Sequence, residues 1–163
     1  MNRDRNRTFV QQSLASLTGC QARLTRSVDQ LASLLPIPAD ALADLTPEQQ
    51  DLIDAFLKRF EQVLITLQDQ VFRGIALLEG HDPGSMSRRD LVELMERVGA
   101  LDSATRFRDQ IALRNRLAQT YPHDPARQAM ILNAAYAAAA DLLATAARSE
   151  QLIHRAHGIN KQD

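Results

Sequence analysis

The sequence predicts an all-α fold, an antiparallel helical bundle of about five helices, and three observations support this prediction. The chain has 24 Ala and 23 Leu residues against 14 Val and Ile residues together, and straight-chain side chains favour helices whereas β-branched ones favour strands. All six prolines fall at the boundaries of periodic apolar segments. Within those segments the apolar residues recur every three or four positions. With 163 residues, the chain is expected to form a single helical domain, 1–163.

The first two expected helices are long. Apolar residues on one face predict a helix from about Thr8 to Leu34. The segment 46–49, Thr-Pro-Glu-Gln, reads as an N-cap, a first-turn proline and a capping-box glutamine. The periodic segment after it predicts a second helix that ends near Gly80.

Three further helices are expected in the second half of the chain. After a turn at 81–85, Ser87 caps a short helix that ends at Gly99. Asp102 or Ser103 starts a fourth helix, which is expected to run through Tyr121 and stop at Pro122. The dipeptide 124–125, Asp-Pro, opens a fifth helix that runs towards Leu152.

Composition and charge narrow the classes of function. The single cysteine, Cys20, cannot form an internal disulfide, and the first residues lack the apolar core of a secretory signal, so a cytoplasmic location is expected. The longest apolar run, 134–140, is far shorter than the ~20 residues that cross a bilayer, so no membrane segment is expected.

The net charge of −1 does not favour non-specific nucleic-acid binding. Any contact with RNA must therefore come from a local site. The acidic stretch 29–54, which has no Lys or Arg, is interpreted as a solvated face.

One charged residue lies on an apolar helix face. On a helical wheel, Arg114 falls inside the stripe formed by Phe107, Ile111, Ala118 and Tyr121. Burying an unpaired charge costs several kcal/mol, so this guanidinium needs an acid on another helix, a wet cleft at an interface or an anionic ligand. Snorkelling of the long side chain to the surface is the remaining alternative.

The residues around Arg114 resemble a known family. The string 114–122, Arg-Asn-Arg-Leu-Ala-Gln-Thr-Tyr-Pro, is similar to the signature of the HEPN superfamily, specifically its HepT-like toxins. The segments 87–91 and 95–104 are similar to the stretch that precedes this signature in the family. The resemblance implies a HEPN-like bundle that forms a homodimer and cleaves RNA between its protomers without a metal or cofactor. It also implies a partner, the MNT-type nucleotidyltransferase antitoxin of such toxin–antitoxin pairs.

The resemblance also assigns roles to individual residues. Arg114 would bind the scissile phosphate, and Asn115 would orient Arg114 or the substrate. The family's histidine falls at Gln119, which cannot shuttle a proton, and losing such a group typically costs ~10²–10⁴ in rate. Tyr121 matches the tyrosine that the nucleotidyltransferase modifies with AMP. His123 is a possible substitute base, although a loop histidine before the next helix is the simpler interpretation.

Two functions from different classes therefore remain open. The first is a HepT-like ribonuclease toxin, weakened or inactive at Gln119 and regulated by a nucleotidyltransferase. The second is a non-catalytic helical module that docks a nucleotidyltransferase or is modified by it. Both predict a two-fold dimer with residues 103–121 of the two chains near the axis. His154 and His157 lie one helical turn apart, but without a third ligand no metal site is expected.

Overall fold

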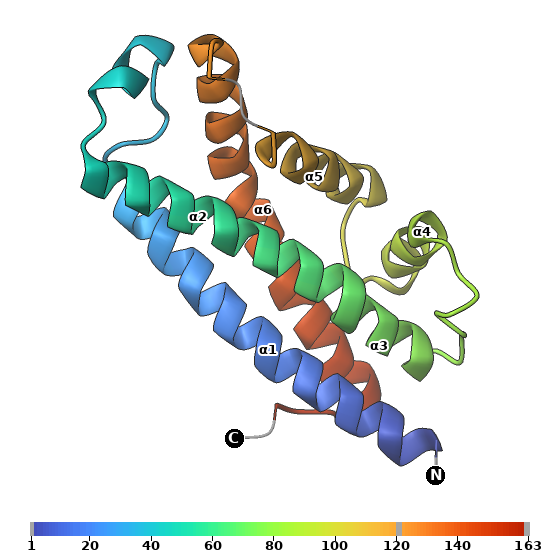
Figure 1. Cartoon of the computed structure of the whole chain (residues 1–163). Helices are drawn as coiled ribbons and strands as arrows, with labels where there is room; N and C mark the ends of the chain where they lie inside the picture. The colour runs from blue at the N-terminus through green and yellow to red at the C-terminus, as the bar shows by residue number, and fades with distance from the viewer. Residues whose placement is uncertain (1, 120–121, 162–163) are drawn as a thin grey trace.

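The computed structural model of the chain describes residues 2–119 and 122–161, and every regular element in that part is helical. Long helices pack along one another, and two shorter helices lie against one side of them (Figure 1). The long helices are α1 (Asn2–Leu31), α2 (Pro47–Thr66) and α6 (Pro125–His157), and α3 (Phe72–Leu78) extends the line of α2. The two helices at the side are α4 (Arg88–Val98) and α5 (Ala104–Leu117). The all-α prediction is confirmed for the residues described.

Four helix starts lie where the sequence places them, because each N-cap side chain accepts a backbone hydrogen bond. Thr46 and Gln49 form the complete capping box at the start of α2, with hydrogen bonds of 3.2 and 2.9 Å. Ser87, Ser103 and Asp124 cap α4, α5 and α6 in the same way. Gly99 ends α4 in the left-handed conformation, as expected of a C-cap glycine.

Several helix boundaries differ from the prediction. The first helix begins at Asn2 and ends at Leu31 instead of spanning 8–34, and Arg7 near its start donates to the carbonyl of Gly158 at 3.0 Å. The last helix continues past Leu152 to His157. A short 3-10 helix, η1 (Ala39–Asp44), which the sequence analysis did not predict, lies between α1 and α2. None of its residues is fully buried, although Ala41 and Leu42 pack against the core.

The second expected helix is continuous but not uniform. Between α2 and α3 the chain forms one π-helical stretch, η2 (Leu67–Val71), and the rod then continues to Leu78, close to the predicted end near Gly80. A π-turn inserts one extra residue per turn and so rotates the helix face. Leu67, Val71 and Ile75 are all buried, so this rotation keeps the four-residue spacing of apolar side chains directed at the core.

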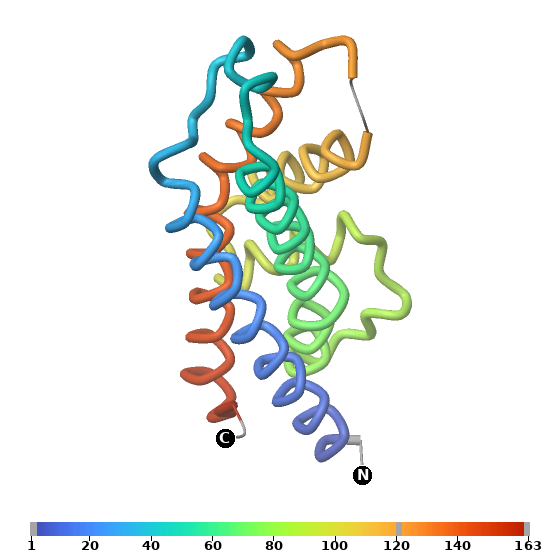
Figure 2. Tube along the Cα trace, turned by 60° about the vertical axis from the view of Figure 1, so that its left-hand side comes forward, coloured from blue at the N-terminus to red at the C-terminus, as the bar shows by residue number. Residues whose placement is uncertain are grey.

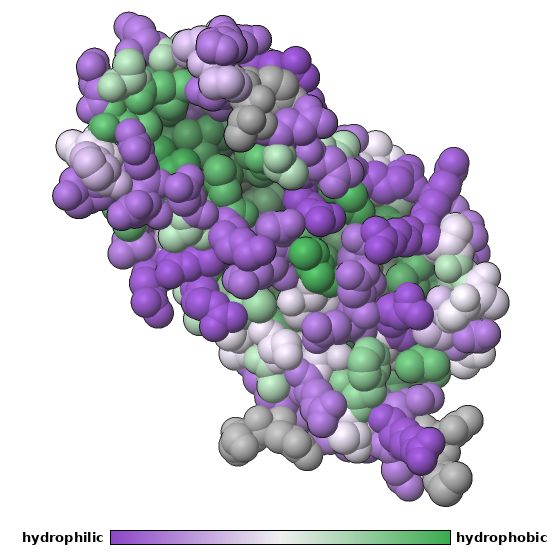
Figure 3. All heavy atoms as spheres, viewed as in Figure 1, coloured by the Kyte–Doolittle hydropathy of each residue, from purple (hydrophilic) through white to green (hydrophobic). Residues whose placement is uncertain are grey.

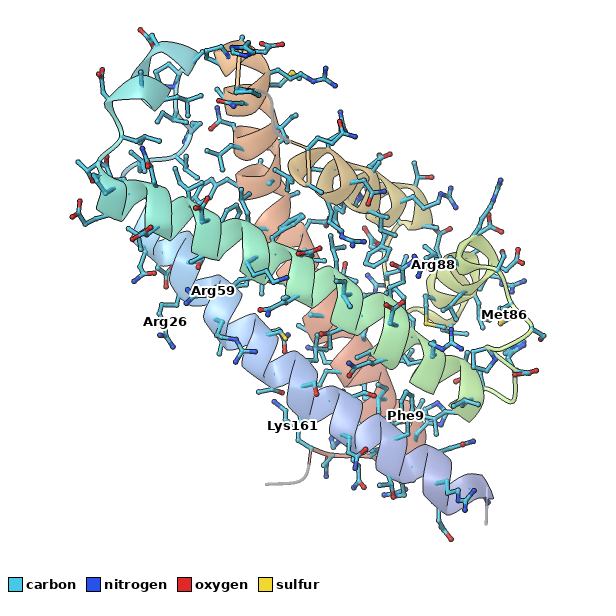
Figure 4. The ribbon with its side chains drawn as sticks, in the orientation of Figure 1. Phe9, Arg26, Arg59, Met86, Arg88 and Lys161 are labelled. Carbon is cyan, nitrogen blue, oxygen red and sulfur yellow. The ribbon has the colours of Figure 1, made fainter. Side chains whose placement is uncertain are left out.

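The core lies between α1, the α2–α3 rod and α6, and α5 closes one side of it. Tube and ribbon views both show α1, α2 and α6 alongside one another (Figures 1 and 2). Phe56, Phe60 and Phe72 are fully buried, and Phe72 contacts Phe107 of α5 with ring centroids 5.0 Å apart. At the rim of the core, Arg59 of α2 donates to Ser27 Oγ of α1 at 2.7 Å. Figure 4 labels Arg59, where α2 lies beside α1.

A side chain of α6 makes two hydrogen bonds to the loop that carries η1. Asn133 accepts a hydrogen bond from the Ile37 backbone N–H at Oδ1 and donates to the Ile37 carbonyl from Nδ2, each at 2.8 Å. The Ile37 side chain is buried in the core. A reciprocal amide pair and the Ile37 side chain therefore help to hold η1 beside the start of α6, together with Leu42 and Leu45, which pack against the core.

Candidate functional site around Arg114

Arg114 lies in the last turn of α5, the helix that carries the start of the motif. This helix packs on α6 and α2 and buries Ala104, Phe107, Gln110 and Leu113. The buried stripe is therefore rotated relative to the predicted one, because Ile111 is only half-buried and Ala118 is exposed. Arg114 lies at the edge of this stripe, and its side chain is 29% exposed.

The guanidinium of Arg114 has an acid partner in its own chain. Its Nε donates to Oε1 of Glu61 on α2 at 3.2 Å, and Oε2 of the same carboxylate accepts from Lys58 Nζ at 3.2 Å. Glu61 is as exposed as Arg114, at 29%. Of the alternatives that the sequence left open, the structure thus shows the salt bridge to an acid on another helix.

The charges around Glu61 affect its titration. Partial burial alone would raise its pKa, but the hydrogen bonds and charges of Lys58 and Arg114 outweigh burial and bring the pKa below the ordinary value of 4.5. The carboxylate is therefore ionised at neutral pH. Arg114 and Lys58 thus share one negative charge.

The ion pair borders a small pocket. This pocket has a volume of about 150 Å³ and is lined by Leu57, Lys58, Glu61, Arg114, Leu117 and Ala118. Three of these six residues are apolar and the other three are the members of the charged cluster. The guanidinium is therefore accessible to a ligand at the surface even though it is paired.

The other predicted site residues lie at or beyond the end of α5. The expected helix through Tyr121 is wrong, because α5 ends at Leu117, with Ala118 as its C-cap in a turn and a bend at Gln119. Asn115, Gln119 and His123 are exposed. Tyr121 lies outside the described residues. The helical register that placed Arg114 and Tyr121 on one face therefore does not extend beyond Leu117.

An apolar groove adjoins the charged cluster and shares Leu57 and Leu117 with the small pocket. Figure 3 shows it as a hollow of apolar residues on the face in view. Its volume is about 340 Å³, within the range of ligand pockets, and its floor is aliphatic. The groove is lined by Leu42, Leu45, Gln50, Ile53, Asp54, Leu57, Arg116, Leu117, Gln119, Gln128, Ile131 and Leu132.

The histidines that could bind a metal are placed apart from this site. His157 Nε2 lies 2.9 Å from Glu79 Oε1 near the C-terminal ends of α6 and α3, and His154 is exposed. Among residues 2–119 and 122–161, no group of three or more His, Cys, Asp or Glu side chains is placed to hold a metal ion.

The helix α6 has the length and composition of a membrane-spanning helix, although its longest uninterrupted apolar run is only 134–140. Within its most apolar 18-residue window, 39% of the residues are buried in the fold. A core helix of a water-soluble protein meets the same criteria. In this fold Ala135, Ala139 and Leu142 of α6 are fully buried against the other helices.

Comparison with known proteins gives no relative: no family model, curated protein or solved structure matches the chain.

Sequence reasoning missed Glu61 and the apolar groove. Glu61 lies four residues after Leu57 and three before Leu64, so it occupies the edge of an apolar face, as Arg114 does on α5. This shared position was the available signal for the pair. The groove gave no such signal, because one of its walls is the irregular segment around η1.

Proposed function

We propose that the chain is a HepT-like ribonuclease toxin weakened at Gln119, acting in the cytoplasm as a homodimer under the control of an MNT-type nucleotidyltransferase. The observation that carries this proposal is the Arg114-Asn115 dipeptide at the surface end of α5, where the guanidinium borders a pocket. A partly exposed guanidinium offers the planar pair of donors that suits a phosphate group. The all-helical bundle is compatible with the proposal but does not distinguish it from other helical proteins.

The decisive residue for cleavage is Gln119. An amide cannot donate or accept a proton near neutral pH, so we expect the natural sequence to cleave RNA slowly or not at all. Gln119→His restores a group that titrates near pH 7 and should raise the rate. The test is metal-free cleavage of a labelled single-stranded RNA by the natural chain, Gln119→His, and Gln119→His combined with Arg114→Ala. Robust cleavage by both the natural chain and Gln119→Ala would refute this role and make His123 the next residue to test.

A non-catalytic binding module is the second candidate, and the apolar groove favours it. Arg116 and Gln119 of the motif line that groove, together with aliphatic side chains from η1, α2 and α6. Grooves of this kind accept an amphipathic helix from a partner protein. Expression of Gln119→His in bacteria, with Gln119→His combined with Arg114→Ala as control, separates the candidates: toxicity that depends on Arg114 supports the ribonuclease, and its absence supports the module.

Modification of Tyr121 is part of both candidates and rests on the family resemblance alone. AMP attached there would add an anion to the chain a few residues after Arg114, where it could compete with RNA phosphate. Incubation with a nucleotidyltransferase encoded beside the chain and ATP, followed by intact-mass and peptide analysis, tests this. An adduct that persists in Tyr121→Phe, or no adduct at all, would show that the assignment is wrong.

A further inference from the structure

Two cations converge on a single carboxylate at the end of α5. Lys58 Nζ and Arg114 Nε each lie 3.2 Å from an oxygen of Glu61, and they approach different oxygens. The three side chains line the same pocket of about 150 Å³. A carboxylate held between an ammonium and a guanidinium occupies the place that an external oxyanion would take.

We propose that Lys58 and Arg114 form a binding site for a phosphate group, and that Glu61 covers this site as an internal competitor. The inference deepens the proposed function, because it concerns the residue that would bind RNA phosphate there, but it requires no cleavage. Lys58 is the new member of the site. It lies on α2, outside the motif that suggested Arg114.

The chemistry of the pocket favours a phosphate. A guanidinium and an ammonium together bind phosphate oxygens by charge-assisted hydrogen bonds, as they bind a carboxylate. Leu57, Leu117 and Ala118 form the rest of the lining, and the Lys58 side chain is 65% exposed, so a phosphate group can approach both cations from solvent. A phosphodiester is negatively charged, so the Glu61 carboxylate both competes with it for Lys58 and Arg114 and repels it. Neutralising Glu61 should therefore increase the affinity of the site for RNA.

The chain contains a matched control for this effect. Glu93 on α4 also bridges two cations, since its Oε1 accepts from Arg89 at 2.9 Å and from Arg108 at 3.4 Å. Its side chain is 44% exposed. Glu93→Gln changes the net charge by the same amount as Glu61→Gln. A difference between the two variants therefore reports on the site and not on overall charge.

The experiment measures binding of a fluorescein-labelled, 2′-O-methylated RNA, which resists cleavage at the 2′-hydroxyl, to full-length protein by fluorescence anisotropy. Glu61→Gln should bind about fivefold more tightly than the natural chain, whereas Glu93→Gln should change affinity much less. Adding Lys58→Met to Glu61→Gln should remove the gain. Glu61→Asp, which keeps the charge, should not produce it.

A second measurement identifies the contact as a phosphate. The slope of log K against log salt should steepen by about 0.7 for each additional phosphate contact in Glu61→Gln. Inorganic phosphate should displace the RNA from Glu61→Gln at lower concentration than from the natural chain. If equal phosphate concentrations are needed for both proteins, the gained contact is not with a phosphate group. Thermal unfolding of each variant confirms that it is folded.

The outcomes separate this inference from the proposed function. Equal gains in Glu61→Gln and Glu93→Gln, or a gain that persists when Lys58→Met is added, would overturn the inference even if Gln119→His cleaves RNA. Tighter binding that depends on Lys58, with no cleavage by any variant, would support the inference and refute the nuclease.

Discussion

At the scale of single residues, a helical wheel predicts that Arg114 needs a partner but does not predict which residue that partner is. The wheel identified a cation beside apolar positions and therefore a need for a partner, and the structure provides Glu61 at 3.2 Å. The wheel could not name Glu61, because the two residues are 53 positions apart and meet only when α2 and α5 pack. Because Glu61 neutralises Arg114 within the same chain, the charge of Arg114 is no longer a reason to expect a dimer interface at this position.

The titration of Glu61 gives a prediction for stability against pH. The pKa of Glu61 in the folded state is below its ordinary value of 4.5. The ion pairs of Glu61 therefore stabilise the fold fully above about pH 4.5, and this stabilisation is lost as the pH falls through the lower, folded-state pKa. The pair is partly exposed, so we expect a difference of at most about 1 kcal/mol between the natural chain and Glu61→Gln.

Urea unfolding of both proteins between pH 7 and pH 3 checks this expectation. The natural chain should be the more stable from neutral pH down to about pH 5, and the difference should close below pH 4.5. A difference that stays constant through the acid range would mean that Glu61 does not stabilise the fold through its charge.

At the scale of elements, the sequence predicts starts better than ends. Thr46, Ser87, Ser103 and Asp124 each bind a backbone N–H within three residues, so a local pattern was enough to find them. Near the start of α1, Arg7 donates to the carbonyl of Gly158, a contact 151 positions away that no local pattern could predict. The end of α5 at Leu117, earlier than expected, also has no local signal such as a glycine or a proline directly after it.

The packing of α1 against α3 leads to a prediction with its own control. A Cβ added at Gly74 would lie 2.8 Å from Val10 Cγ2, and Val10 is buried with a stiff side chain. Gly74→Ala should therefore destabilise the fold by about 1–3 kcal/mol. Gly19→Ala, also within a helix, meets nothing closer than 3.8 Å and should stabilise it by about 0.5–1 kcal/mol.

Thermal or urea unfolding of the two glycine variants measures both effects. Opposite signs are expected, because both substitutions gain helix propensity and only one creates a clash. If Gly74→Ala were as stable as Gly19→Ala, then α1 and α3 would be less closely packed than the structure shows.

The attachment of η1 can be tested at Asn133. Its amide makes two hydrogen bonds of 2.8 Å to the backbone of Ile37, and Asn133→Ala leaves both backbone groups without these partners. We expect a loss of about 1–3 kcal/mol in unfolding free energy and faster hydrogen exchange at the Ile37 amide. Asn160→Ala, at an exposed position, is the control and should change neither. Unchanged exchange at Ile37 would show that apolar packing holds this loop without the two hydrogen bonds.

At the scale of the whole molecule, charge is unevenly distributed around the apolar groove. The segment that supplies one wall, 29–54, contains acids and no Lys or Arg, whereas the other wall includes Arg116 of α5. Asp54 and Arg116 both line the groove, and neither side chain has a salt bridge among the residues that the structure describes. A surface with an apolar floor and unpaired charges of opposite sign is complementary to itself about a two-fold axis, where each acid meets the base of the other copy.

The proposed homodimer can therefore be tested by exchanging these two charges. We expect a dimer at micromolar concentration, with the Asp54–Arg116 contact made twice across the axis. Asp54→Arg and Arg116→Asp should each weaken the dimer by placing like charges opposite each other, and the double variant should restore it. Sedimentation equilibrium of the four proteins measures this, with salt reducing the differences because the charges are at the surface. If the natural chain is monomeric, the homodimer is refuted. If it is a dimer that neither single substitution weakens, the dimer interface does not include this groove.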